Sequence, residues 1–233
     1  MADYGLKVAT PNSEIQIDSL YRNLCRDQTG TNTITNGGTG DTYFTEISIT
    51  SLSLSPLILV QPGTDFFTAV QSYNKTADNY TAFRMITEYN QSTTINWECC
   101  RETPTLSGET YGLRIYNPGG NLVFDSGKRY FKVRSVHTFS VENPSGTVYP
   151  YVDISHPDIS NPFYILTPGS FSIFCWDCAS SLGYCVAVDI IGLKKLSATS
   201  VRVGWFSLGS GKSQNLLDSG IYNPQQKLIV CEA

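Results

Sequence analysis

Residues 111–126 read YGLRIYNPGGNLVFDS, and this stretch decides the fold expected of the chain. An alternating strand runs into an Asn-Pro pair and two glycines, and a second alternating strand follows, which is the pattern of a β-hairpin. The proline fixes φ for a turn and cannot continue a hydrogen-bonded ladder. We expect the apolar residues that share one face of the two strands to cover a sheet; these are Leu113, Ile115, Leu122 and Phe124.

The same pattern occurs near the start of the chain. Residues 4–19 read YGLKVATPNSEIQIDS and align with 111–126 without a gap at an offset of 107, with Tyr, Gly, Leu, Pro, Asp and Ser identical. A partial third copy, IYNPQQKLIV, occupies residues 221–230. The repetition predicts two tandem sandwich-like units with a duplicated N-terminal hairpin. The expected units are 1–106, with hairpin 4–19, and 107–233, with hairpin 111–126 and a closing hairpin at 216–231.

Composition supports an all-β chain. Charged residues make up 15% of the 233 residues, against about 25% in ordinary soluble domains, and Thr, Ser, Asn, Gly and Tyr take their place. Short strand-like runs recur between Gly, Pro, Asn and Asp turns at the spacing of a β-sandwich. Residues 27–42 are so polar that we expect a surface loop there.

Charge and hydropathy exclude several classes of function. The net charge of −4, with 16 basic residues, argues against nucleic acid as a partner, because phosphate binding needs clustered cations. No run approaches the roughly 20 apolar residues of a membrane helix, so we expect no membrane insertion. The first residues lack the pattern of a secretory signal, so we expect a soluble chain that is synthesised in a cytosol.

The pattern Tyr-Gly-Leu, then an Asn-Pro or Gly-rich turn, then Asp-Ser resembles small tail-associated structural proteins of tailed bacteriophages, which often open with this hairpin. The resemblance covers residues 4–19 and 111–126 and part of 221–230. It implies a non-enzymatic virion component of the tail tip or baseplate that is made in the bacterial host cytoplasm and acts in tail assembly. Other tail proteins are then its partners, and no catalytic residue or cofactor carries over.

Repetition itself favours assembly over catalysis, because a repeated apolar hairpin suits a packing surface, whereas a catalytic site needs one set of matched groups. One strand face of the second hairpin carries a mixture that is enriched at protein interfaces, and we predict it as the interface: Tyr111, Arg114 and Tyr116. A homo-oligomer on a three- or six-fold tail axis is expected. The alternatives are a receptor- or glycan-binding module that contacts host-surface glycan, and a hydrolase on a β-scaffold.

The seven cysteines offer a candidate metal site. An iron–sulfur cluster needs four thiolates, and three of them would be Cys175, Cys178 and Cys185. A structural zinc site needs a second Cys pair or nearby histidines, and the two histidines are distant in sequence. We therefore expect no metal and no cofactor, and we interpret the cysteines as buried thiols that behave as small apolar side chains.

Overall fold

The structure is a computed structural model. It describes residues 7–9, 15–18, 24–35, 44–52, 55–102, 106–130, 132–140, 149–159, 162–166, 171–177, 184–213, 220–222 and 225–232. The regular elements in these ranges are all β-strands, which confirms the all-β class. Within the same ranges, no helix could cross a membrane.

The strands divide evenly along the chain. The first half contains β1 (Lys7–Ala9), β2 (Ile15–Asp18), β3 (Cys25–Thr35), β4 (Thr45–Leu52), β5 (Leu57–Gln61), β6 (Thr68–Thr76), β7 (Asn79–Thr87) and β8 (Ser92–Arg101). The second half contains β9 (Arg114–Tyr116), β10 (Leu122–Asp125), β11 (Lys132–Ser140), β12 (Tyr151–Ser155), β13 (Pro162–Leu166), β14 (Phe171–Asp177), β15 (Tyr184–Ser197), β16 (Ser200–Ser213), β17 (Gly220–Tyr222) and β18 (Gln225–Glu232).

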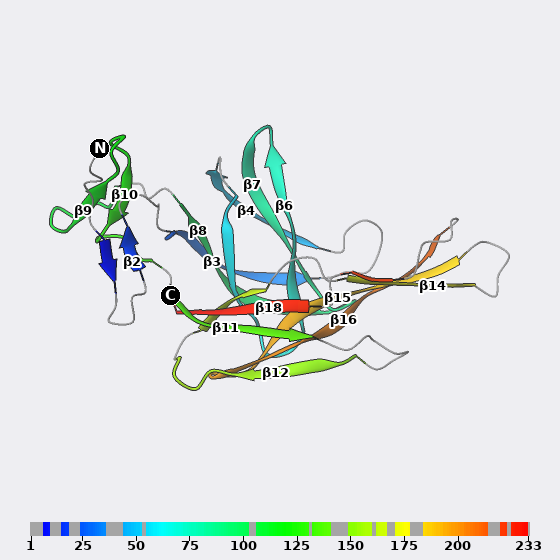
Figure 1. Ribbon diagram of the computed structural model, residues 1–233. Coiled ribbons are helices and arrows are strands. Elements are labelled where there is room, and N and C mark those ends of the chain that lie inside the picture. Colours follow the sequence, from blue (N-terminus) through cyan, green and yellow to red (C-terminus); the bar gives the residue numbers. More distant parts are fainter. Residues whose placement is uncertain are drawn as a thin grey trace.

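Two large antiparallel sheets form the body of the molecule (Figure 1). One has the strand order β11-β18-β13-β5-β8-β3, and the main path of the other is β12-β16-β15-β6-β7-β4. The largest apolar clusters of the described residues lie one in each half of the chain, and two smaller clusters join the halves, one with Cys100 and Cys231 and one with Ile86 and Phe206. In the cluster of the first half, the rings of Phe83 and Trp97 meet edge to face. In the cluster of the second half, Tyr164 and Trp205 are the largest fully buried side chains. Each half therefore has its own core, and both sheets run through both halves.

Each half contributes three strands to the main path of each sheet, and their order is the same in both halves. β3, β4, β5, β6, β7 and β8 occupy the places that β11, β12, β13, β15, β16 and β18 occupy in the second half. The halves meet edge to edge, β5 beside β13 and β6 beside β15. One residue pair is aligned at each contact, Val60 with Tyr164 and Thr68 with Leu193.

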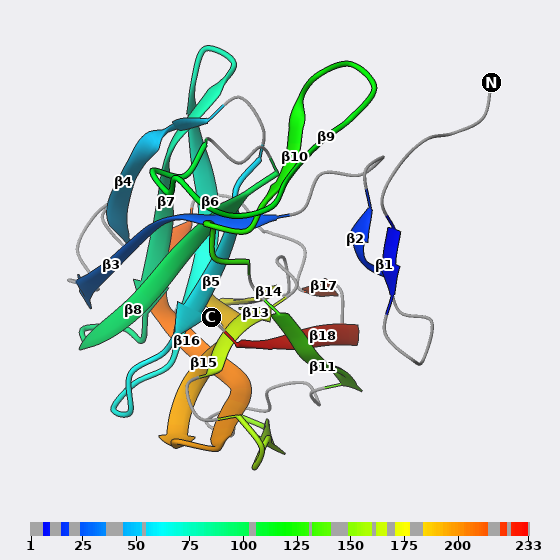
Figure 2. The same cartoon turned by 90° about the vertical axis from the view of Figure 1, so that its left-hand side faces the viewer.

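The two small hairpins also share one register. In the first, Lys7 pairs with Asp18 and Ala9 with Ile15, with an irregularity in between. In the second, Arg114 pairs with Asp125 and Tyr116 with Leu122, again with an irregularity. Every aligned pair of the second hairpin is displaced from its counterpart by 107 residues. Figure 2 shows both hairpins outside the large sheets.

The predicted polar loop at 27–42 is wrong in its first part, because β3 extends to Thr35; residues 36–42 lie outside the described residues. This edge strand pairs with β8 and keeps one face in solvent, so polar β-branched residues suit it. Side chains reinforce the pairing: Thr31 Oγ1 donates to Asn96 Oδ1 at 2.7 Å, and Trp97 Nε1 donates to Asn32 Oδ1 at 2.7 Å.

The predicted closing hairpin at 216–231 is also wrong. β17 pairs with β14, whereas β18 lies in the other sheet between β11 and β13. The Asn-Pro pair at 223–224 was interpreted as a tight turn, but the strands on either side of it part to different sheets. β18 instead takes the place that β8 has in the first half.

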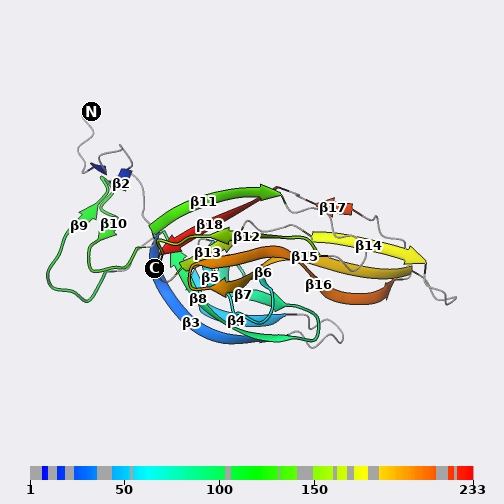
Figure 3. The ribbon, with the colours of Figure 1, turned by 90° about the horizontal axis from the view of Figure 1, so that it is seen from below.

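The outer parts of β15 and β16 extend beyond the sandwich. β14 pairs along β15, and β17 pairs with the start of β14. Figure 3 shows these strands projecting away from the body, at the end opposite the β9–β10 hairpin. Among the described residues of the first half, no strand corresponds to β14 or β17.

Candidate interaction surface on the second hairpin

The three predicted interface residues lie on or next to the β9–β10 hairpin, and all three are exposed to solvent. Tyr111 is 92% exposed and Tyr116 is 49% exposed. Leu106 and Leu113 are exposed to 59% and 48% in the same segment. We call these four side chains the hairpin surface. Its apolar groups are clustered in a short segment, which distinguishes it from scattered exposed residues.

Asp125 organises the hairpin beneath this surface. Its carboxylate is 2% exposed and accepts hydrogen bonds from the Ser107 N–H at 2.9 Å, the Ser107 hydroxyl at 2.9 Å and the Gly127 N–H at 2.9 Å. Burial alone would raise the pKa of Asp125, but these bonds and the contact with Arg114 outweigh it and lower the pKa to about 2. The carboxylate is therefore charged at neutral pH and joins the loop before β9 to the turn after β10.

Arg114 belongs to the same framework. Its Nε lies 3.3 Å from Asp125 Oδ2, and its Nη2 donates to the carbonyls of Ser107 at 3.4 Å and Glu109 at 2.8 Å. The guanidinium is thus engaged inside the hairpin and positions the loop that carries Leu106. Its role as a contact residue stays a prediction.

Ser126 of the repeated pattern packs against Gly112 and forms hydrogen bonds with Leu113. The Ser126 hydroxyl accepts the Leu113 N–H at 2.8 Å, and the Ser126 N–H donates to the Leu113 carbonyl at 2.9 Å. Gly112 has a φ of +141°, and a Cβ there would lie 2.4 Å from Ser126 Oγ. Only glycine fits this close approach without strain. The Gly-Leu and Asp-Ser parts of the pattern therefore build one hydrogen-bonded unit.

Gly112→Ala is expected to destabilise the hairpin by about 2 kcal/mol, because the added methyl clashes with Ser126 and φ is unfavourable. Loss of amide-exchange protection at Leu113 measures the effect. Gly108→Ala is the matched control, since a Cβ at Gly108 meets nothing within 4 Å. Equal protection in both variants would show that the Gly112–Ser126 contact does not fix the hairpin.

The apolar packing differs from the sequence-based expectation. Val123, not Leu122 or Phe124, is the fully buried residue of β10, and Leu113 is half exposed. Burial still alternates along β10, but the buried face is the one that carries Val123 and Asp125, not the one that carries Leu122 and Phe124. Phe124 packs instead on the Tyr130 ring, with centroids 4.9 Å apart.

The cysteines behave as apolar side chains where the structure describes their side chains. Cys25, Cys99, Cys100 and Cys231 are buried and free, and burial raises the pKa of Cys99 and of Cys231 to about 12. Thiols with such pKa values stay protonated at neutral pH and are poor nucleophiles. No group of metal-binding side chains occurs among the described residues.

Of the three iron–sulfur candidates, the structure places two by their backbone. Cys175 pairs with Val186 in the β14–β15 ladder, and Cys185 pairs with Trp176. The two cysteines are therefore not cross-strand partners. Cys178 lies outside the described residues.

A cavity of about 360 Å³ lies where the two halves meet, between β5 and β6 on one side and β13 and β15 on the other. Apolar side chains dominate its lining, with Tyr73 and Tyr164 as phenols. Burial raises the pKa of Tyr73 to about 12 and also raises that of Tyr164, whose hydroxyl lies 2.5 Å from His156 Nε2. The cavity can hold an apolar group, and its phenols stay protonated at neutral pH.

The sequence analysis does not identify Asp125 and Ser107 as the pair that organises the hairpin, because it treats Asp-Ser only as part of the repeated pattern. The repeated Asp before Ser in both hairpins was the available signal. The repeated Asp indicates a side-chain role that a simple turn does not require.

No protein-family model, curated protein or solved structure was found to match this chain.

Proposed function

We propose that the chain is a non-enzymatic structural component of a bacteriophage virion, in the tail tip or baseplate, and that the hairpin surface acts in tail assembly. The observation that carries this proposal is that different residues of the second hairpin hold its backbone and face the solvent. Buried and hydrogen-bonded residues, Asp125 above all, hold the backbone, while Tyr111 and Tyr116 stand in solvent. Fixed exposed aromatics suit binding to a protein partner, because little side-chain entropy is lost on contact.

The phage assignment rests on the resemblance of the hairpin pattern, and the structure supports it by giving the patterned residues a joint role. Gly112, Asp125 and Ser126 form one framework, so the pattern describes a self-contained module rather than any hairpin.

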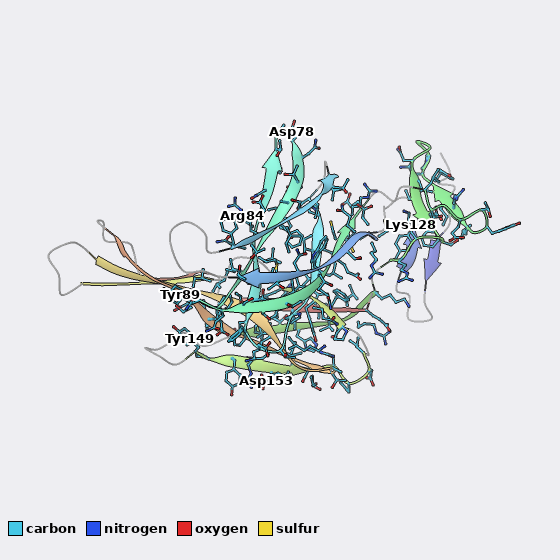
Figure 4. The ribbon with its side chains drawn as sticks, turned by 180° about the vertical axis from the view of Figure 1, so that it is seen from behind. Asp78, Arg84, Tyr89, Lys128, Tyr149 and Asp153 are labelled. Carbon is cyan, nitrogen blue, oxygen red and sulfur yellow. The ribbon has the colours of Figure 1, made fainter. Side chains whose placement is uncertain are left out.

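Tyr116→Asp in the phage that encodes the chain is expected to leave the fold intact and to reduce incorporation into particles at least tenfold, because a charge is placed in an apolar contact. Quantitative mass spectrometry of purified particles measures the copy number, and the melting temperature of the isolated variant reports the fold. Tyr89→Asp is the control: Tyr89 is 46% exposed and lies on the turn after β7, far from the hairpin (Figure 4).

Normal incorporation of the Tyr116→Asp protein would show that the hairpin surface is not the assembly surface. If the wild-type chain is missing from particles, the structural role itself is wrong. Binding of the purified wild-type chain to host cells would favour the alternative, a receptor- or glycan-binding module.

A further inference from the structure

We propose that the cavity between the two halves binds a free fatty acid, with the hydrocarbon chain inside the cavity and the carboxylate beside Lys75 at the open end. The cavity shares no residue with the hairpin surface. Binding of a fatty acid can therefore be measured on the purified chain, independently of any role of the hairpin surface in particles.

The cavity lies where the strands of the two halves are joined at only one point in each sheet. Val60 of β5 is aligned with Tyr164 of β13, and Thr68 of β6 is aligned with Leu193 of β15. Among the described residues, no second aligned pair joins these strands. The edges of four strands therefore border the space between the sheets, and the cavity is this space.

The cavity is long, with one closed end and one open end. Its lining follows the chain from Val60 back to Ser55 and along β6 from Thr68 toward residue 73, a length of roughly 17 Å at the rise of a β-strand. Val60 and Thr68 are buried, whereas Ser55 and Gln71 are exposed. A volume of about 360 Å³ spread over that length makes a channel about as wide as one hydrocarbon chain. An extended chain fits this shape better than a broad ring system.

The cavity offers little to water below its open end, because the polar side chains there already have partners. Thr68 Oγ1 donates to a backbone carbonyl of β7 at 2.8 Å, and the Tyr164 hydroxyl lies 2.5 Å from His156 Nε2. The Tyr73 hydroxyl is hydrogen-bonded to the backbone of β5. Buried water needs about two to four polar partners, and an apolar cavity without them stays dry and takes up apolar molecules. A hydrocarbon chain therefore suits this lining.

The open end of the cavity leads to a cation. Tyr73 lines the cavity, and its ring meets that of Tyr80 edge to face, with centroids 6.1 Å apart. Lys75 Nζ lies 4.4 Å from the centroid of the Tyr80 ring. Hydrogen bonds with Ser55 and Lys75 lower the pKa of the Tyr80 phenol, so this phenol joins the rim of the cavity to the ammonium group. Among the described residues, no carboxylate forms an ion pair with Lys75.

The distribution of charge fixes the orientation of the fatty acid. The described lining has no charged side chain, so a carboxylate inside the cavity would be buried without a partner, which is costly. At the open end the carboxylate stays hydrated and lies beside the ammonium group of Lys75. The hydrocarbon chain gains free energy with every methylene group that it removes from water. An anionic molecule with a single chain meets both requirements.

Titration calorimetry of the purified chain with fatty acids of different length tests the site. We expect one dodecanoate to bind per protein, with an affinity that falls about fourfold for each methylene group removed. The affinity should stop rising once the chain is longer than the cavity, so hexadecanoate should bind no more tightly than tetradecanoate. Absence of saturable binding, or an affinity that does not depend on chain length, would overturn the proposal.

Val70→Phe tests whether the hydrocarbon chain occupies the cavity. Val70 lines the cavity and is half-buried, so a larger ring there takes up the space of the chain. We expect the affinity for dodecanoate to fall about tenfold or more. Val136→Phe makes the same change on the exposed side of β11 and serves as control, and the melting temperatures of both variants report the fold. An unchanged affinity in Val70→Phe would overturn the cavity as the site.

Lys75→Glu tests the place of the carboxylate. The variant is expected to bind dodecanoate about tenfold more weakly, because a repulsive charge replaces an attractive one. It should bind uncharged 1-dodecanol as the wild type does. Lys132→Glu, on exposed β11, makes the same change of charge and serves as control. An unchanged affinity for dodecanoate in Lys75→Glu would overturn this placement. Binding to phosphatidylglycerol vesicles without binding of free dodecanoate would overturn a free fatty acid as the ligand.

Discussion

Arg26→Val is expected to lower the free energy of unfolding by about 3–5 kcal/mol, because it leaves the buried Glu98 carboxylate without its cation. Glu98 is 1% exposed, and the Arg26 guanidinium donates to its Oε1, while Oε2 has no hydrogen-bond partner. Burial raises the pKa of Glu98, and the positive charge of Arg26 opposes that rise. Urea denaturation at pH 7 measures the loss of free energy. An unchanged dependence of that free energy on urea concentration, the m value, shows that the variant keeps the fold.

The pH dependence of this variant has a definite sign. Without Arg26, less opposes the effect of burial, so the pKa of Glu98 rises further above its ordinary value. A folded-state pKa raised above the unfolded one gives stability that is present at low pH and is lost as the pH rises. Arg26→Val should therefore be closer to the wild type at pH 5 than at pH 7.

The second unit supplies the control. At the positions of Arg26 and Glu98 it has Val133 and Ile229, since both pairs hold the same places in the ladders. A buried ion pair can be replaced by apolar residues at little cost, whereas breaking it is expensive. Arg26→Val/Glu98→Ile should thus recover most of the stability lost in the single variant. If the double variant is as unstable as Arg26→Val, an unpaired buried charge is not the cause.

Much of the strand content could be predicted from local patterns, and the strands that could not be predicted belong to one sheet. The strands that sequence reasoning missed, β3, β5 and β13, all belong to the six-stranded sheet. β3 is a polar edge strand, so it lacks an apolar alternation. β5 and β13 are short strands with buried or half-buried residues on both faces, and such runs do not show a period. Their pairing partners lie far away in sequence, which a local pattern does not reveal.

The sequence similarity at an offset of 107 extends beyond the two hairpins. Residues 44–48 read FTEIS and residues 151–155 read YVDIS, at the same offset. These segments place the carboxylates that pair with Arg84 and Arg202 at the two outer edges. The pairing of β5 with β13 and of β6 with β15 could not be predicted from the sequence, because the paired residues lie more than 100 positions apart.

Asp125→Asn is expected to remove about 2 kcal/mol of local stability from the second hairpin at pH 7, because a neutral amide loses the charge that the surrounding donors stabilise. The fall should appear as a roughly 30-fold loss of amide-exchange protection at Ser107 and Gly127, whose N–H groups donate to the carboxylate. Asp78→Asn, at the exposed turn between β6 and β7, makes the same change of charge and serves as control.

The pH dependence of the second hairpin shows whether the charge of Asp125, and not only the shape of its side chain, stabilises the hairpin. Its folded-state pKa of about 2 lies below the ordinary value of 3.8, so the stabilisation is complete above about pH 5 and is lost as the pH falls toward 2. Amide shifts of Ser107 and Gly127 in the wild type should therefore titrate near pH 2, and in Asp125→Asn they should not titrate there. Titration near pH 4 in the wild type would show an ordinary surface carboxylate. The exposed Tyr111 and Tyr116 would then lack the fixed backbone on which their proposed role in assembly depends.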